Sequence, residues 1–341
     1  MRHQAKVQAC LLAVLVLVTA CGQAVDGSAR RGPPAGDPSV FFAGPVAVFG
    51  RTPSPADTAT LSYLRALRRI DVCGLVNRET VGRSGEINWY GTLFAFDDCD
   101  AAVKVAGRPA QQYLSVQVAW EHPTGQPAFT AAGLPVHETS PGSCEFLLPL
   151  RLADLPGAPP LTSDNQPVVK TSVIGGGDCA LARRTTTALA EWLDGRPPPA
   201  RDGVAAYPIR LAEQDPCAVL AVVGGEVAAW DIERGAPYQC VFDLKRGAQP
   251  VSVQVSLAPK VGNMVIDGRE RREIDGVLVY VDRAFCAAGS IVGPQMQRRL
   301  AAGGYEDPPD TVIVPTVTVD GGGADCDTVA RITADAAKLY G

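Results

Sequence analysis

Apolar residues recur along this chain with two periods, one typical of helices and the other of strands. From Asp57 to Ile70 large aliphatic residues recur at every third position, which predicts a helix whose N-cap is Asp57. From Leu114 to Trp120 apolar residues alternate with polar or small ones, which predicts a half-buried strand. Further strands are expected at Phe94–Phe96, Phe146–Leu148 and Pro167–Ile174, and further helices at Val72–Val76 and Leu181–Leu193.

The second half of the chain repeats the pattern of the first. Ser115–Val118 and Ser252–Val255 consist of the same four letters. Trp89 and Trp230 each stand ten residues before a cysteine, and in each half a glycine run leads into Asp-Cys and a helix. The cysteine spacings are 26, 45 and 35 residues in the first half and 23, 46 and 40 in the second. This agreement indicates a duplication.

We therefore expect two related domains of the α+β class, each a small antiparallel sheet packed with helices and stapled by two disulfides. The first domain is expected to span residues 57–194 and the second residues 205–341. Residues 195–204 are expected to be a linker, because Gly195–Pro199 breaks any helix.

The first residues predict export. Arg2 and Lys6 precede a short apolar run, so residues 1–20 are expected to be a signal peptide. Val18-Thr19-Ala20-Cys21 resembles the lipobox of bacterial lipoproteins, in which the cysteine carries a diacylglycerol. This resemblance implies a protein anchored through Cys21 to the extracytoplasmic face of the cell membrane. The alternative is an ordinary cleaved signal peptide that contains a cysteine.

Residues 21–56 are rich in Gly, Pro, Ala and Ser and are expected to form a flexible tether. Two large apolar residues interrupt this composition, Phe41 and Phe42, and they either dock on the first domain or lie at the membrane surface.

The exported chain is acidic. Removing Arg2 and Lys6 lowers the basic residues from 31 to 29 against 36 acidic ones, so the formal charge moves from -5 to -7. This balance argues against nucleic acid as a partner. The lipid bilayer, contacted through an acylated Cys21, is the partner that the sequence predicts.

Cysteine usage indicates disulfides. Of 10 cysteines, Cys10 lies in the signal peptide and Cys21 would be acylated, which leaves eight. Each domain permits three pairings, and we favour the local one because it ties a helix start to a neighbouring strand. The favoured pairs are Cys73 with Cys99, Cys144 with Cys179, Cys217 with Cys240 and Cys286 with Cys326. No metal or cofactor is expected, because no CxxC pair is present and the exported part has few histidines.

The residues around these cysteines carry a resemblance to a family. Asp-Pro-Cys-x-x-Leu at Cys217, the aromatic-flanked Cys240, and Asp-Cys at Cys179 and Cys326 resemble the exported four-cysteine lipoproteins of high-GC Gram-positive bacteria. Related domains are similar to the extracellular sensor domains of membrane serine/threonine kinases, which implies a binding role by analogy of fold. Cys286 lacks the usual flanking strand residues, so the second domain is expected to deviate there.

Candidate chemistry is sparse. The glycine runs lack phosphate-loop spacing, and Asp178 and Asp325 are expected to be helix N-caps. The three acids around Cys99, namely Asp97, Asp98 and Asp100, lack the spacing of a calcium loop and are expected to lie in a water-exposed turn.

Two histidines and four tryptophans remain. His122 or His137 would have to serve as the base of a hydrolase, but neither a GxSxG elbow nor a free thiol accompanies them. Trp120 and Trp192 are expected in the core, whereas Trp89 and Trp230 are weak candidates for ligand binding.

Three functions are consistent with the sequence. The first is a noncatalytic binding or sensor-accessory lipoprotein, whose partner is an envelope protein, peptidoglycan or a small ligand. The second is an envelope hydrolase with a histidine base. The third is a spacer or assembly module, which predicts no apolar cleft at the domain junction.

Overall fold

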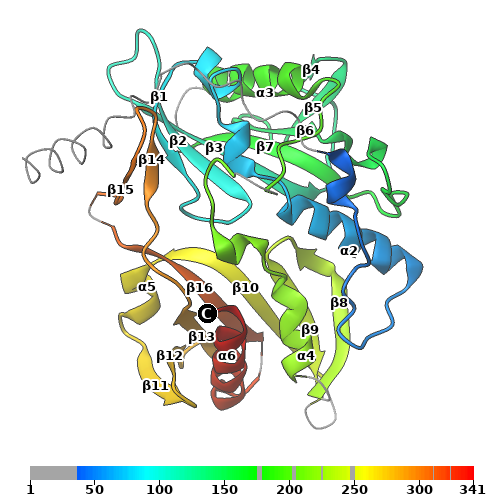
Figure 1. Cartoon of the computed structure of the whole chain (residues 1–341), viewed down its shortest axis with the longest axis vertical. Helices are drawn as coiled ribbons and strands as arrows, with labels where there is room; N and C mark the ends of the chain where they lie inside the picture. The colour runs from blue at the N-terminus through cyan, green and yellow to red at the C-terminus, as the bar shows by residue number, and fades with distance from the viewer. Residues whose placement is uncertain are drawn as a thin grey trace, which may run out of the picture. The chain divides into compact units, whose positions relative to one another are not determined.

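Two antiparallel sheets with helices packed against them form the part of the chain that the computed structural model describes (Figure 1). The described residues are 37–174, 179–201, 205–223, 226–245, 250–309, 311–322 and 324–341. All of them lie in one compact unit, Ala35–Gly341. The α+β class predicted from the sequence is confirmed. Within these ranges no helix is long and apolar enough to cross a bilayer.

The first sheet has nine strands in the order β15-β14-β1-β2-β3-β7-β6-β5-β4. Seven of them come from the first half: β1 (Glu86–Gly91), β2 (Asp98–Lys104), β3 (Gln112–Glu121), β4 (Phe129–Ala131), β5 (Leu134–Glu138), β6 (Glu145–Pro149) and β7 (Gln166–Ile174). Leu114, Val116 and Val118 of β3 are buried, as their alternation predicts. Helix α3 (Cys179–Leu193) packs on β6 and β7.

The second sheet has seven strands in the order β11-β12-β13-β16-β10-β9-β8. Its strands are β8 (Val227–Ala236), β9 (Gln239–Leu244), β10 (Val251–Val261), β11 (Glu270–Ile274), β12 (Val277–Asp282), β13 (Ala287–Ile291) and β16 (Ile313–Gly322). Helix α6 (Cys326–Tyr340) packs on β12, β13 and β16. The shorter elements are η2 (Pro38–Phe41), η3 (Val72–Leu75), η4 (Val81–Arg83), η5 (Arg151–Asp154), η6 (Arg210–Glu213), η7 (Pro216–Ala218), α4 (Val219–Val223) and α5 (Gly262–Ile266).

The two sheets share one strand order. Read from β1 the first sheet runs β1-β2-β3-β7-β6-β5-β4, and read from β8 the second runs β8-β9-β10-β16-β13-β12-β11. Each strand of the first half thus has a counterpart at the same place in the second. The second half differs by the hairpin of β14 (Arg298–Leu300) and β15 (Tyr305–Glu306), which pairs with β1 of the first sheet.

The four disulfides occupy equivalent places in the two halves, and the favoured local pairing is confirmed. Cys73 with Cys99 and Cys217 with Cys240 each join a 3-10 helix to the second strand of a sheet. Cys144 with Cys179 and Cys286 with Cys326 each join the residue before a strand to the first residue of a helix. The backbone at Cys144 and Cys286 even shares a positive φ, at 58° and 47°. The expected deviation around Cys286 was therefore wrong.

The register of the strands corrects two details of the repeat. Cys99 pairs with Val116, whereas Cys240 pairs with Val255, so the four-letter string is displaced by two residues between the halves. A displacement of two keeps the same residues on the same face, which explains why the letters agree although the positions do not.

The tryptophans are not equivalent either. A bulge follows Ile87 in β1 and Val227 in β8. Beyond the bulge, Tyr90 of β1 pairs with Ala101, two residues after Cys99. Trp230 of β8 pairs with Phe242, two residues after Cys240, so Trp230 corresponds to Tyr90. Trp89 therefore corresponds to Ala229, and the shared tryptophan spacing reflects no common structural position.

The ends of the first elements also differ from expectation. Helix α2 (Pro55–Arg68) begins three residues earlier than predicted, with Ser54 as N-cap and Asp57 as the third helical residue, which completes a capping box. Asp57 is thus a capping residue but not the N-cap. The stretch Phe94–Phe96 forms a loop and not a strand, and β2 starts only at Asp98.

Residues 37–54 pack on the folded body and do not form a tether. Phe41 is 1% exposed, and Phe42 packs edge-on against Tyr63 of α2 at 5.4 Å between ring centroids. The guanidinium of Arg65 donates to the carbonyls of Gly44 and Pro45 at 3.0 and 2.6 Å. Of the two expectations for the phenylalanines, docking is the one observed.

Several contacts join the two halves. Arg68 of α2 pairs with Asp215 at 2.5 Å and donates to the carbonyl of Pro237 at 3.0 Å. The rings of Phe96 and Tyr238 meet at 5.5 Å. The linker lies along the first half, because Pro199 accepts from the amide of Asp71 and the amide of Arg201 donates to Arg69, both at 2.8 Å.

Candidate functional site

A cleft of about 680 Å³ opens beside the linker and is the candidate site of this protein. Its walls come from five separate stretches of the second half of the chain: Tyr207–Leu211 with Gln214, Val292–Gln297, the β15 residue Tyr305, the β16 residue Pro315, and Leu339–Gly341. Pockets of about 300–1,000 Å³ are the usual size for small-molecule sites. Because β15 joins the first sheet through β14, the cleft lies where the second half meets that sheet.

The stretch after β13 forms the floor. Strand β13 ends at Ile291, and the chain then follows β16, held by the amide of Val292 donating to Pro315 at 3.0 Å and that of Met296 donating to Ile313 at 2.7 Å. Gly293 is required there, because a Cβ would stand 2.6 Å from the Pro315 ring. Met296 is 7% exposed and presents a soft apolar surface.

The opposite wall is fixed by two tyrosine hydroxyls. Tyr238 donates to the carbonyl of Ala212 at 2.8 Å, which holds η6 in place. Tyr340 of α6 donates to the carbonyls of Asp215 and Pro216 at 2.8 and 2.9 Å. Burial raises the pKa of the Tyr340 phenol, and the nearby Asp215 charge adds to it.

A pair of tyrosines closes the end of the cleft toward the first sheet. The rings of Tyr207 and Tyr305 lie 6.1 Å apart, and Tyr305 is 48% exposed whereas Tyr207 is buried. Burial raises the pKa of the Tyr207 phenol, which therefore stays protonated. Arg299 fixes the pair by donating to the carbonyl of Ala206 at 3.0 Å and to the Tyr305 hydroxyl at 3.3 Å.

The polar groups of the cleft stand at its rim. Arg210, Gln214 and Gln295 are exposed there. Gln297 is also exposed, but its amide donates to Asp307 at 3.1 Å. The floor is thus apolar and the edge polar, the arrangement by which a site gains affinity from burial and orientation from a few polar groups.

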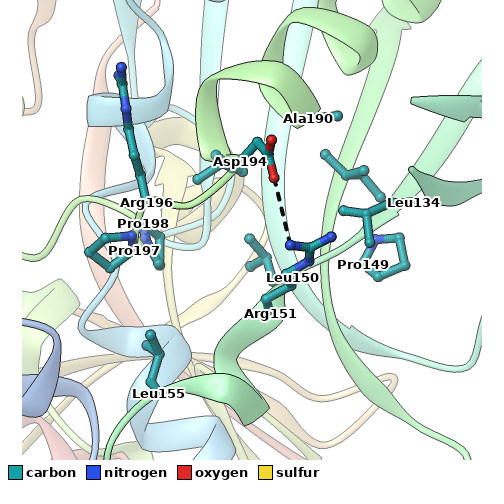
Figure 2. Close-up of a pocket in the computed structure, with 12 residues that line it drawn as sticks. Leu134, Pro149, Leu150, Arg151, Leu155, Ala190, Asp194, Arg196, Pro197 and Pro198 are labelled. Carbon is teal, nitrogen blue, oxygen red and sulfur yellow. Dashed lines mark ion pairs between the residues drawn. The ribbon is translucent and has the colours of Figure 1, made fainter. Parts of the chain in front are cut away.

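A second hollow is far smaller. It holds about 30 Å³ between the end of α3, the turn after β6 and the linker prolines. Figure 2 shows the ion pair of Arg151 and Asp194, which lies at 3.6 Å in the wall of this hollow with Leu150 beside Arg151. A hollow of this size holds about one or two waters and no organic ligand.

The expectation of a water-exposed turn at the acids around Cys99 was wrong, because only Asp97 lies in a turn and it is half-buried. Asp98 and Asp100 are residues of β2, and their side chains share one face of the sheet with Ser115. The Ser115 hydroxyl donates to Asp98 at 2.7 Å. Asp100 is 2% exposed, and neither carboxylate oxygen has a hydrogen-bond partner among the described residues.

Burial changes the proton affinity of these acids. It raises the pKa of Asp97 to about 6, that of Asp98 to about 7 and that of Asp100 to about 8. The charge of Asp97 contributes at Asp98, and that of Asp98 at Asp100. The three groups therefore hold protons in a range where ordinary carboxyls are ionised.

Tyr207 separates these acids from the cleft. Gly91 lies beside Asp100 in the pairing of β1 with β2, and a Cβ on Gly91 would stand 3.4 Å from the Tyr207 ring. Tyr207 thus covers the face on which Asp100 lies while its ring also lines the cleft. The described residues contain no cluster of His, Cys, Asp and Glu arranged to hold a metal ion.

The two histidines stand outside the cleft. Nδ1 of His122 lies 2.9 Å from the carbonyl of Asp164, and Nδ1 of His137 lies 3.3 Å from that of Thr124. Because a carbonyl only accepts, each ring carries its proton on Nδ1 in the neutral state. The structure does not bring the two rings together with the buried acids or with each other in one pocket.

Neither candidate tryptophan lines the cleft. Trp89 lies under the guanidinium of Arg298 at 4.8 Å and near Tyr113 at 6.1 Å. Trp230 packs on Phe49 at 6.1 Å. A binding role for Trp89 or Trp230 stays a prediction.

The remaining predictions concern two helix N-caps and the lipidation site. Asp325 is the N-cap of α6 and accepts from the Thr328 amide at 2.8 Å, as predicted. Asp178 and the lipidation site Cys21 lie outside the described residues.

The sequence did not identify the cleft, because its lining comes from five stretches of the chain that share no motif. Comparison with protein-family models, curated proteins and solved structures finds no match.

Proposed function

We propose that this protein is a noncatalytic ligand-binding lipoprotein of the cell envelope, with a sensor-accessory role. The cleft at the junction is the observation that carries this proposal. It has the size of a small-molecule site, an apolar floor and a polar rim. A spacer module predicts no such cleft, so the cleft favours binding over a purely structural role.

Location is part of the same proposal. Four disulfides join cysteines in the described part of the chain, and such bonds persist in oxidising compartments. These disulfides support export. The lipobox-like sequence at Cys21 supports attachment by a diacylglycerol, whose two acyl chains suffice for stable anchoring.

The binding role is tested by blocking the cleft. Leu339 is 42% exposed at the rim, so Leu339→Trp adds bulk there without disturbing the core. Mass spectrometry of molecules captured from envelope extract should detect a ligand on the native protein and at least tenfold less on this variant. Leu161→Trp is the control, since Leu161 is 41% exposed away from the cleft. Capture unaffected by Leu339→Trp, or absent from the native protein, would contradict the proposal.

Anchoring is tested by replacing the acylated residue. Cys21→Ala should release the protein into the medium with its disulfides intact, because the lipid is the only anchor proposed. Cys10→Ala changes a cysteine of the signal peptide and should leave the protein on the membrane. Fractionation followed by immunoblotting measures both, and membrane retention of Cys21→Ala would refute lipid anchoring.

A further inference from the structure

The rim of the cleft carries one positively charged side chain, that of Arg210. Arg210 is exposed and lines the cleft, and among the described residues it forms no ion pair. Asp215 pairs with Arg68 at 2.5 Å and Glu306 with Arg298 at 2.5 Å, whereas Glu213, three residues after Arg210 in η6, is exposed and does not line the cleft. Gln214, Gln295 and Gln297, which line the cleft with Arg210, are neutral amides.

The floor, by contrast, offers apolar contacts. Leu211 is 6% exposed and Met296 is 7% exposed, and the buried Pro315 of β16 lies beside Gly293 in the same cleft. Burying an alkyl chain against such a surface is favourable by roughly 0.8 kcal/mol per methylene. A ligand that satisfies both zones has an apolar chain and one anionic group.

Resting on the proposed binding function, we propose that the cleft binds a single-chain amphiphile with an anionic headgroup. Its chain lies on the floor formed by Leu211, Met296 and Pro315, and its headgroup pairs with Arg210. The amides of Gln214 and Gln295 stand on the same rim and can donate to the headgroup oxygens.

The two zones contribute differently to affinity. An ion pair at an open rim is screened by water. Compared with a neutral headgroup, the anionic headgroup should therefore raise affinity by about two- to fivefold. The chain supplies most of the binding free energy, because burying a long alkyl chain contributes more than a water-screened ion pair. A short anion without a chain is therefore not retained.

The probes are dodecanoate below its critical micelle concentration, the neutral dodecanol below its solubility limit, and acetate. Equilibrium binding to the purified full chain should give a one-to-one complex with dodecanoate, binding of dodecanol that is about two- to fivefold weaker, and none of acetate. Arg210→Gln should lower dodecanoate affinity to the dodecanol value and leave dodecanol unchanged. Arg184→Gln, an exposed arginine of α3, is the matched control and should change neither. Leu339→Trp should abolish both.

Other results would overturn the proposal in distinguishable ways. Equal affinity for dodecanoate and dodecanol, or no effect of Arg210→Gln, would contradict recognition of an anionic headgroup but not the proposed binding function. Failure of both probes together with a captured ligand that Leu339→Trp removes would mean that the cleft binds another class of molecule. Failure of both probes with no such ligand would remove the binding role as well. Binding to phosphatidylglycerol vesicles without uptake of dodecanoate would place anion recognition on the surface and not in the cleft.

Discussion

The carboxylate of Asp100 is buried without a hydrogen-bond partner among the described residues, an arrangement that costs free energy when the group is charged. Burial raises its pKa to about 8, that of Asp98 to about 7 and that of Asp97 to about 6. Between pH 4 and these values the folded chain binds more protons than the unfolded chain. The free energy of unfolding therefore falls as pH rises from about 4 to about 8.

Asp100→Asn should accordingly stabilise the protein at pH 8 by about 1–3 kcal/mol, because it removes an unpaired buried charge. At pH 5 the wild-type carboxyl is already neutral, so the gain should be much smaller. Urea unfolding at both pH values with the disulfides intact measures the difference. Glu86→Gln, an exposed acid at the start of β1, serves as the control and should leave the pH profile unchanged. An equal effect of Asp100→Asn at both pH values would show that the charge is not the cause.

Part of this residue-level picture could be predicted from the sequence and part could not. Cysteine order and local pairing were predictable, because each cysteine borders a strand or helix with a clear hydrophobic period. The burial of Asp98 and Asp100 was not predictable, because three acidic residues among four consecutive positions are typical of a solvated turn. In the second half Val241 occupies the place of Asp100, since both lie one residue after the disulfide cysteine of the second strand. That apolar counterpart was the one indication that the position faces inward.

At the scale of elements, the hairpin β14–β15 is where the second half departs from the first. Trp89 pairs with Leu300 and Tyr90 with Arg299, so the hairpin covers the edge of β1. Arg298 holds it by pairing with Glu306 at 2.5 Å and stacking over Trp89 at 4.8 Å. An unpaired edge strand is a liability for aggregation, and the hairpin removes it from β1.

Replacing Arg298–Glu306 by a short Gly-Asn-Gly turn should expose the edge of β1. Hydrogen exchange of the β1 amides that pair with β14 should accelerate about tenfold or more. The reason is that these amides would no longer be protected by hydrogen bonds to β14. Mass spectrometry of a peptide spanning Glu86–Gly91 measures the rate. The central strand β7 serves as the internal control and should keep its slow exchange. Unchanged exchange in β1 would mean that other contacts protect it.

The sequence predicted the most strongly periodic elements but not the shorter strands or the element boundaries. Strands β3, β6 and β7 and helices α2 and α3 follow from clear periodicity, and the matching order of the halves follows from the cysteines. The hairpin was missed because it is short, charged and has no counterpart in the first half. The strand expected at Phe94–Phe96 is a loop, because two alternating phenylalanines also occur where a loop buries one of them, here Phe96.

At the scale of the whole molecule, contacts between the halves determine whether they unfold together. Arg68 is 8% exposed and joins α2 to Asp215 and to the carbonyl of Pro237 in the second half. The Phe96–Tyr238 ring contact and the hairpin on β1 add apolar and backbone contacts. The cleft belongs to this level as well, because Tyr305, part of its wall, lies in the hairpin that pairs with β1 of the first sheet.

We therefore expect calorimetry of the native protein to show one unfolding transition, with equal calorimetric and van't Hoff enthalpies. Arg68→Met should lower the free energy of unfolding by about 1–3 kcal/mol, because it leaves Asp215 and the Pro237 carbonyl without their buried donor. Arg83→Met is the matched control: Arg83 pairs with Glu191, but the two side chains are 52% and 51% exposed. It should cost less than about 0.5 kcal/mol. Two separate transitions in the native protein would show that the halves are energetically independent.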